Sequence, residues 1–327
     1  MRKFINKILF FILPVMLLIY PIDYLISNYI SESEDHAMGE TKVWKDIYSG
    51  KINSGLVVYG SSRAWVQFSS KMIEDSLNIS TYNLGIDGHN FKLQYFRHKE
   101  LLRFNKKPKK IIMSVDIFTL QKKTDLYNHQ QFLPFMLWNE SIKDYTSSYT
   151  GFSTYDFNIP LYRYKGSLNT IKTVIYTLIR REPEIKRIKG YSAVVGNWNN
   201  DFYNAKSKND FYEIKIDSAT VNLFEKFINE CKNNDIELSL VFSPEFIEGQ
   251  HYVRNRKELI SKYQNLANKY NLQFLDYSNS EICFQKQYYY NAQHLNKNGS
   301  ELFTKLLIKD LKVNEKMNGE FRNKKVL

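Results

Sequence analysis

Short apolar runs recur along most of the chain. They predict strands at 55–59, 80–84, 110–116, 236–242 and 272–275, because each is short and is rich in aliphatic, β-branched or aromatic residues. The run at 110–116 is apolar almost throughout. A continuous run of this kind is typical of a strand covered on both faces, as in a parallel sheet.

Stretches with apolar residues at helical spacing lie between these runs. They predict helices at 69–77, 91–104, 217–231, 258–270 and 299–311. Strands that alternate with helices favour an α/β fold, here a three-layer α/β/α sandwich around a parallel sheet.

The alternation breaks between about 121 and 214, where the chain is aromatic-rich and irregular apart from a predicted helix at 167–180. A loop of this length is too long to be structureless in a compact domain, so we expect an inserted cap or lid. Its aromatic side chains either form a small core of their own or, in part, line a groove for carbohydrate.

The first thirty residues predict an uncleaved signal anchor. Basic residues precede the apolar run at 8–20, and Lys7 and Asp23 would have to snorkel for the segment to reach bilayer length. Positive charge on the short N-terminal side puts that side in the cytoplasm and the rest outside it. A cleaved signal peptide is the alternative, although no small-residue cleavage site follows.

The expected domain order follows from these features. It is a cytoplasmic tip and transmembrane anchor at 1–30, a polar linker at 31–54, a main domain at 55–315 with the insertion at 121–214, and a basic tail at 316–327.

The charge distribution limits the binding partners of the chain, and the cysteine content limits its disulfide bonds. The 327-residue chain has a formal net charge of +12, but its Lys residues are mostly scattered and no zinc or RNA-binding signature accompanies them. We therefore expect no nucleic-acid partner. Cys231 and Cys283 cannot build a disulfide framework in a chain of this size, and a single bridge between them stays open.

The first strand ends in Gly60-Ser61-Ser62, followed by a segment with helical spacing. This arrangement delivers a hydroxyl to the carboxyl edge of the sheet, next to the N–H groups of a helix start. It is also how an ordinary serine-capped helix begins. Near the other end of the chain, His294 precedes the last predicted helix and Asn291 lies three residues before it. A histidine is the side chain suited to take a serine proton at neutral pH.

These segments resemble the conserved blocks of the SGNH (GDSL-like) hydrolases, and their order and flanking strands are similar. Gly60-Ser61-Ser62 resembles the first block, 82–88 the second, and Asn291-Ala292-Gln293-His294 the last, which is Asp-x-x-His in the family. The resemblance covers about 54–118 and 217–311. It is strongest to membrane-anchored members that act on bacterial envelope polymers, including relatives of the D-alanylation and alginate-acetylation proteins. It implies an SGNH/flavodoxin-like fold.

The resemblance implies Ser62 as nucleophile, His294 as base, and the N–H groups of Ser62 and Gly88 as oxyanion donors. Two departures matter. Asn291 stands where the family has Asp, and the third block, Gly-x-Asn, is not recognisable at 113–117. The protein would then use a Ser–His dyad, recruit another acid, or be inactive. The candidate acids are Asp87, Asp116, Glu245 and Asp276.

Three further points stay open. Ser61 competes with Ser62 for the role of nucleophile, and Arg63 would bind an anionic acceptor or cap the sheet edge. Gly60-x-Ser62-x-Ala64 also nearly matches the α/β-hydrolase elbow, but there the serine usually follows several strands. Asp87, Asp116 and Glu245 are expected near the substrate.

The functional hypothesis is an extracytoplasmic, membrane-anchored hydrolase or O-acyltransferase that acts on ester bonds of an acylated envelope polysaccharide. It needs no metal or organic cofactor, and a membrane-bound acyltransferase is a candidate partner. The alternative is a non-catalytic envelope protein that kept the fold and binds glycan or a membrane partner.

Overall fold

The computed structural model describes residues 2–88, 91–123 and 126–324. The chain divides into two compact units. The helical unit consists of Met1–Ser49 and Thr124–Lys186, and the sheet unit of Gly50–Lys123 and Arg187–Leu327. This division differs from the expected one, because 187–214 belong to the sheet unit and residues before 50 belong with the insertion.

Five parallel strands form the sheet in the order β2-β1-β3-β4-β5, which confirms the predicted parallel α/β fold. The strands are β1 (Leu56–Tyr59), β2 (Thr81–Asn83), β3 (Lys110–Val115), β4 (Glu237–Phe242) and β5 (Gln273–Asp276). The strand order reverses at β1, so the loops after β1 and β3 diverge. Ligands of open α/β sheets bind at such a point, outside the carboxyl ends of the strands.

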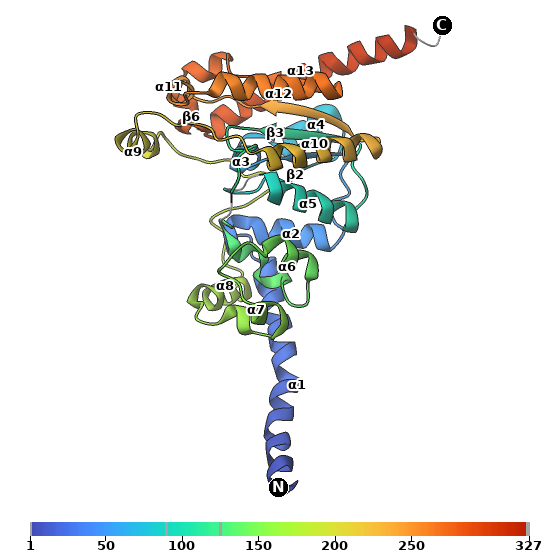
Figure 1. Ribbon diagram of the computed structural model, residues 1–327, viewed down its shortest axis with the longest axis vertical. Coiled ribbons are helices and arrows are strands. Elements are labelled where there is room, and N and C mark those ends of the chain that lie inside the picture. Colours follow the sequence, from blue (N-terminus) through green and yellow to red (C-terminus); the bar gives the residue numbers. More distant parts are fainter. Residues whose placement is uncertain (1, 89–90, 124–125, 325–327) are drawn as a thin grey trace. The chain divides into compact units, whose positions relative to one another are not determined.

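Helices cover both faces of this sheet (Figure 1). On one face lie α3 (Ser62–Gln67), α4 (Ser70–Leu77) and α13 (Lys297–Lys324), whose Phe303 packs against Phe68. On the other lie α5 (Phe91–Phe104) and α10 (Ser218–Asn233), whose Phe227 packs against Tyr59. The helix α12 (Arg256–Tyr270) packs against the edge strand β5.

The last helix is longer than predicted. It begins two residues earlier and continues through 316–324, where a basic tail was expected, and 325–327 lie outside the described residues.

Residues 31–54 were expected to form a polar linker. Up to residue 49 they instead belong to the helical unit. Its elements are α1 (Arg2–Glu32), η1 (His36–Gly39), α2 (Glu40–Tyr48), η2 (His129–Phe135), α6 (Glu140–Thr146), α7 (Thr154–Asn158), η3 (Tyr162–Tyr164) and α8 (Leu168–Leu178). Trp44 of α2 is fully buried, donates a 2.8 Å hydrogen bond to Gln131 and packs on Phe132. Aromatic residues of the insertion therefore form a local core, while the carbohydrate groove stays a prediction.

The N-terminal segment forms most of α1. Among the residues that the structure describes, no helix is long and apolar enough to cross a membrane. The anchor hypothesis required the Asp23 side chain to snorkel, but it does not. It is 2% exposed and forms an ion pair of 2.7 Å with Arg163, which is also buried. Asp23 thus fixes this part of α1 within the helical unit.

We expect Asp23→Ala to destabilise the helical unit by about 3–5 kcal/mol, because it leaves a buried guanidinium without its counter-charge. Chemical denaturation followed by tryptophan fluorescence measures this change. The control is Glu32→Ala, which removes surface ion pairs to Lys42 and Lys45 and should cost less than about 1 kcal/mol. Equal effects of the two substitutions would contradict a buried, stabilising ion pair.

Candidate active site

The turn after β1 holds both serines in defined places. Gly60 has φ +152°, and a Cβ there would lie 2.7 Å from the Ala64 Cβ, so the turn requires glycine. Ser61 is the N-cap of α3 and accepts a 3.3 Å hydrogen bond from the Arg63 N–H. Ser62 is the first residue of the helix. The capped helix start and the presented hydroxyl are therefore both present, on neighbouring serines.

A hairpin of β6 (Tyr289–Asn291) and β7 (His294–Leu295) brings the histidine to this turn. The Ser62 Oγ lies 2.8 Å from the His294 Nε2. The Gln67 side chain at the end of α3 donates a 3.0 Å hydrogen bond to the Gln293 carbonyl, which ties the hairpin to the helix that carries the serine. The Tyr290 ring stacks on the imidazole at a centroid distance of 5.3 Å.

The Asn291 side chain determines which imidazole nitrogen carries the proton. Its Oδ1 lies 3.1 Å from the backbone nitrogen of Gln293, 3.0 Å from that of His294 and 2.9 Å from the His294 Nδ1. Backbone N–H groups only donate, so the amide atom that they contact is the oxygen. Nδ1 must then donate to the same oxygen, which leaves Nε2 free to accept from the Ser62 hydroxyl.

The other side of the Asn291 amide faces a carboxylate that the sequence analysis missed. The Asn291 Nδ2 donates to the Asp201 Oδ2 at 3.2 Å. Asp201 is the first residue of α9 (Asp201–Lys208), and the Asn199 N–H donates to the Tyr290 carbonyl at 2.7 Å, which brings this segment to β6. Residue 291 thus suits an amide, since an Asp there would put two carboxylates face to face.

None of the four candidate acids forms a described contact with His294. Asp116 accepts from the Ser61 hydroxyl, and from the Phe118 N–H at 2.7 Å. Asp276 accepts from the Ser278 N–H, and Asp87 lies in the loop after β2. Burial and the Asp87 and Asp201 carboxylates raise the pKa of Tyr290 in the hairpin. Of these two carboxylates, Asp201 is the one that acts on His294.

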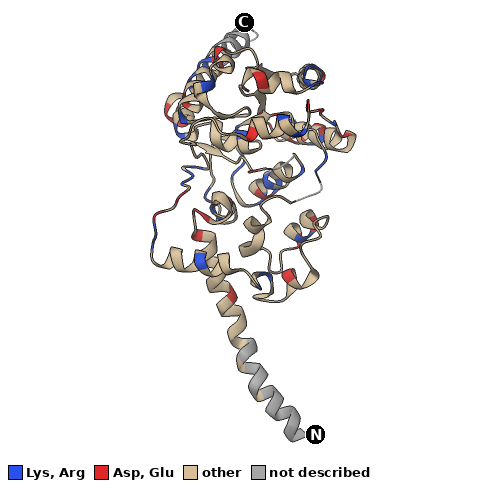
Figure 2. Cartoon of the chain, turned by 90° about the vertical axis from the view of Figure 1, so that its left-hand side faces the viewer, with Lys and Arg blue, Asp and Glu red and all other residues tan. Residues whose placement is uncertain are grey.

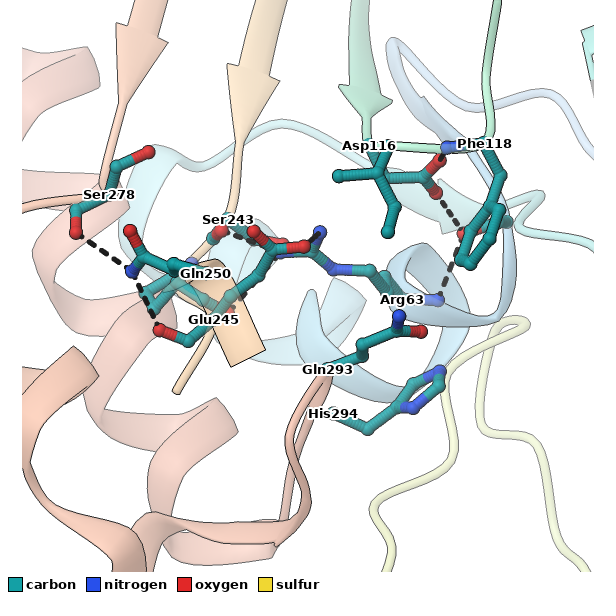
Figure 3. Close-up of polar contacts among 12 residues, drawn as sticks. Arg63, Asp116, Phe118, Ser243, Glu245, Gln250, Ser278, Gln293 and His294 are labelled. Carbon is teal, nitrogen blue, oxygen red and sulfur yellow. Dashed lines mark hydrogen bonds and ion pairs between the residues drawn. The ribbon is translucent and has the colours of Figure 1, made fainter. Parts of the chain in front are cut away.

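Of the two roles left open for Arg63, its contacts fit the cap of the sheet edge, and Glu245 is its buried partner there. Arg63 is 2% exposed, and its guanidinium binds Glu245 at 2.7 Å and the Ser243 carbonyl at 2.6 Å (Figure 3). Glu245 also pairs with Arg256 at 2.9 Å. This buried network joins the start of α3 to the end of β4, so Arg63 serves the structure of the nucleophile turn.

The loop after β2 lies beside the same turn. The Ile86 N–H donates to the Gly60 carbonyl at 2.9 Å, and Gly88, two residues on, has φ +68°. The third strand, which lacks the family's Gly-x-Asn block, ends at Val115, and the next residue, Asp116, holds Ser61. Asp116 therefore contributes to the nucleophile turn by holding Ser61, the N-cap of α3, in place.

Burial lowers the pKa of the His294 imidazole to about 3; the Arg63 guanidinium acts in the same direction and the Asp201 carboxylate opposes it. The ring is therefore neutral at pH 7 and can accept a proton. Cys231 and Cys283 are both free and buried, so no bridge joins them. Among the described residues, no cluster of His, Cys, Asp or Glu could hold a metal ion.

Comparisons with known proteins give similarity at the level of solved structures. No family model matches the chain, and no curated protein does. A GDSL-like lipase from Bacteroides thetaiotaomicron is 9% identical, with a TM-score of 0.38, over 84% of this chain and 99% of its own. A protein assigned to the G-D-S-L lipolytic family of Desulfitobacterium hafniense is 13% identical, with a TM-score of 0.36, over 78% of this chain and 98% of its own.

A protein assigned as an acylhydrolase from Bacteroides fragilis is 13% identical, with a TM-score of 0.35, over 87% of this chain and 97% of its own. Similarities at these TM-scores carry no argument about activity. The functional conclusion therefore depends on the geometry of Ser62, His294 and Asn291.

We expect the His294 imidazole to show no titration midpoint between about pH 5 and pH 8, because its pKa lies far below the ordinary value. Carbon-13 NMR of histidine-labelled protein measures this. The comparison variant is Asn291→Asp, in which a carboxylate on Nδ1 raises the pKa of His294. A midpoint near the ordinary histidine value in the unsubstituted protein would contradict the neutral ring.

Proposed function

We propose that this chain is a serine ester hydrolase of the SGNH type. Two consecutive hydrogen bonds carry the proposal. The Ser62 hydroxyl donates to the His294 Nε2, and the His294 Nδ1 donates to the Asn291 Oδ1. This is the relation of nucleophile, base and orienting group that acyl transfer requires.

The reaction begins when the Ser62 Oγ attacks an ester carbonyl carbon while its proton passes to the His294 Nε2. The new C–O bond moves the carbonyl π electrons onto oxygen. As the tetrahedral intermediate collapses, the ester C–O bond breaks and the leaving alkoxide takes the proton from Nε2. Water repeats the same sequence on the acyl-serine and releases the acid. A second hydroxyl in place of water makes the reaction an acyl transfer.

Two donors support the negative charge on the oxyanion, and two acceptors support the positive charge on the imidazolium. The Ser62 N–H lies in the first turn of α3, where helix N–H groups have no partner within the helix, and it suits an oxyanion. Gly88 is the second proposed donor. The imidazolium that forms is stabilised by the Asn291 oxygen and, through the amide, by the Asp201 carboxylate, which is weaker support than a direct Asp gives.

Asn291 and the missing third block were the arguments for the alternative, a non-catalytic envelope protein that binds glycan or a membrane partner. In serine proteases with a Ser-His-Asp triad, changing the Asp to Asn lowers turnover about 10⁴-fold because the ring takes the wrong tautomer. Here two backbone N–H groups hold the amide with its oxygen toward Nδ1, which favours the productive tautomer. This geometry favours the enzyme.

The substrate that we propose is an O-acylated polysaccharide of the cell envelope, on the basis of the sequence resemblance. We also propose that α1 attaches the chain to the cell membrane, with the sheet unit outside the cytoplasm and a membrane-bound acyltransferase as a partner. Release of acetate from an O-acetylated polysaccharide, against its appearance on a second glycan, distinguishes hydrolysis from transfer.

We expect Ser62→Ala to abolish labelling by a fluorophosphonate probe and to lower hydrolysis of p-nitrophenyl acetate by at least about 10³-fold, because the variant has no nucleophile. The matched control is Ser69→Ala, which removes the serine N-cap of α4 and should leave labelling intact. Labelling that persists in the Ser62 variant, or its absence from the unsubstituted protein, would overturn the proposal.

A further inference from the structure

The helix α8 has its polar and apolar sides reversed relative to a normal surface helix. At about 100° per residue, its exposed aliphatic residues fall within an arc of about 100°. These residues, here called the α8 stripe, are Leu168, Ile171, Ile175 and Leu178 with the C-cap residue Ile179, and their exposed fractions run from 48% to 80%.

The side of α8 that faces its own unit is polar. Thr170 is 3% exposed, and Thr173 and Thr177 are partly buried on the same side, opposite the α8 stripe. The Thr173 Oγ1 lies 3.4 Å from the Nδ1 of the buried His36. The threonine hydroxyl groups thus face the interior of the unit, and the isoleucine and leucine side chains face outward. This helix therefore suits an apolar environment.

The apolar surface continues onto α1, against which α8 packs. Leu17, Leu18, Tyr20, Tyr24 and Leu25 are each 47% to 67% exposed. By their spacing these residues, together with Ile22, which is 44% exposed, spread over about 200° of the helix circumference. A protein partner docked on one face of α1 would leave part of this apolar surface in water, whereas a lipid environment would cover all of it. Between residues 10 and 25 of α1 the only charged residue is Asp23, and the part of α1 that Figure 2 draws in colour is accordingly almost all tan.

Basic and aromatic side chains flank the α8 stripe as they do at a bilayer surface. Lys172 and Arg180 are exposed at its margins, where they suit anionic headgroups, and the exposed Arg181 pairs with Glu184 at 2.9 Å. Trp138 is 58% exposed and stacks on Tyr20 of α1 at 5.3 Å, which is the pairing of rings and position that membrane interfaces favour.

We propose that α8 lies in the plane of an anionic lipid surface, with the α8 stripe at the boundary between headgroups and acyl chains. The helical unit then holds the protein to the membrane at a second place besides α1. This inference is independent of the proposed hydrolase activity, because it uses no residue of the active site.

Site-directed spin labelling of the full chain tests this contact. A nitroxide is attached at Ile175→Cys in the α8 stripe, or at Asn169→Cys, an exposed position on the same helix outside the stripe. The native cysteines are buried and should not react. Power-saturation EPR then compares the accessibility of each label to oxygen and to a water-soluble nickel complex, with and without vesicles of phosphatidylglycerol and phosphatidylcholine.

We expect vesicles to raise oxygen accessibility and to lower nickel accessibility at least several-fold at position 175, and to change position 169 much less. Circular dichroism checks that both variants fold. Unchanged accessibility at position 175 would overturn the proposal. Protection from both reagents there would also overturn it, because it would indicate a protein interface.

Discussion

Two backbone N–H groups in the β6–β7 hairpin determine the chemistry available at His294. Those of Gln293 and His294 both point at one atom of the Asn291 side chain, so that atom must be the amide oxygen. The imidazole is thereby held with Nδ1 protonated and Nε2 bare. An asparagine at this position orients the imidazole as an aspartate would, although it supplies no charge of its own.

The rest of the site depends on how the sheet unit presents Ser62 to that nitrogen. The turn after β1 lies where the strand order reverses, and the required Gly60 lets α3 start close to β3. Arg63, the residue after the serine, anchors the turn to the end of β4 through Glu245 and Ser243. A buried ion pair of this kind contributes little net stability, but loss of one partner is costly. It therefore resists displacement of the serine.

Local patterns predicted the strands and most helices of the sheet unit, because continuous apolar runs and helical spacing need no knowledge of distant residues. Ser62 and His294 were also found from short motifs. Asp201 was not, because its contact with Asn291 depends on how the segment at 199–201 reaches β6, and no local pattern encodes that. Asp23 was assigned a snorkelling role because its partner Arg163 is 140 residues away. The polar start of 31–54 likewise hid the inward-facing Trp44.

The most direct measurement of the central claim is nitrogen-15 NMR of the His294 imidazole at pH 7. The account predicts a neutral ring with the proton on Nδ1 and a bare Nε2, and the same tautomer in Ser62→Ala. A proton on Nε2, or an imidazolium at this pH, would contradict it, because neither form can accept the Ser62 proton.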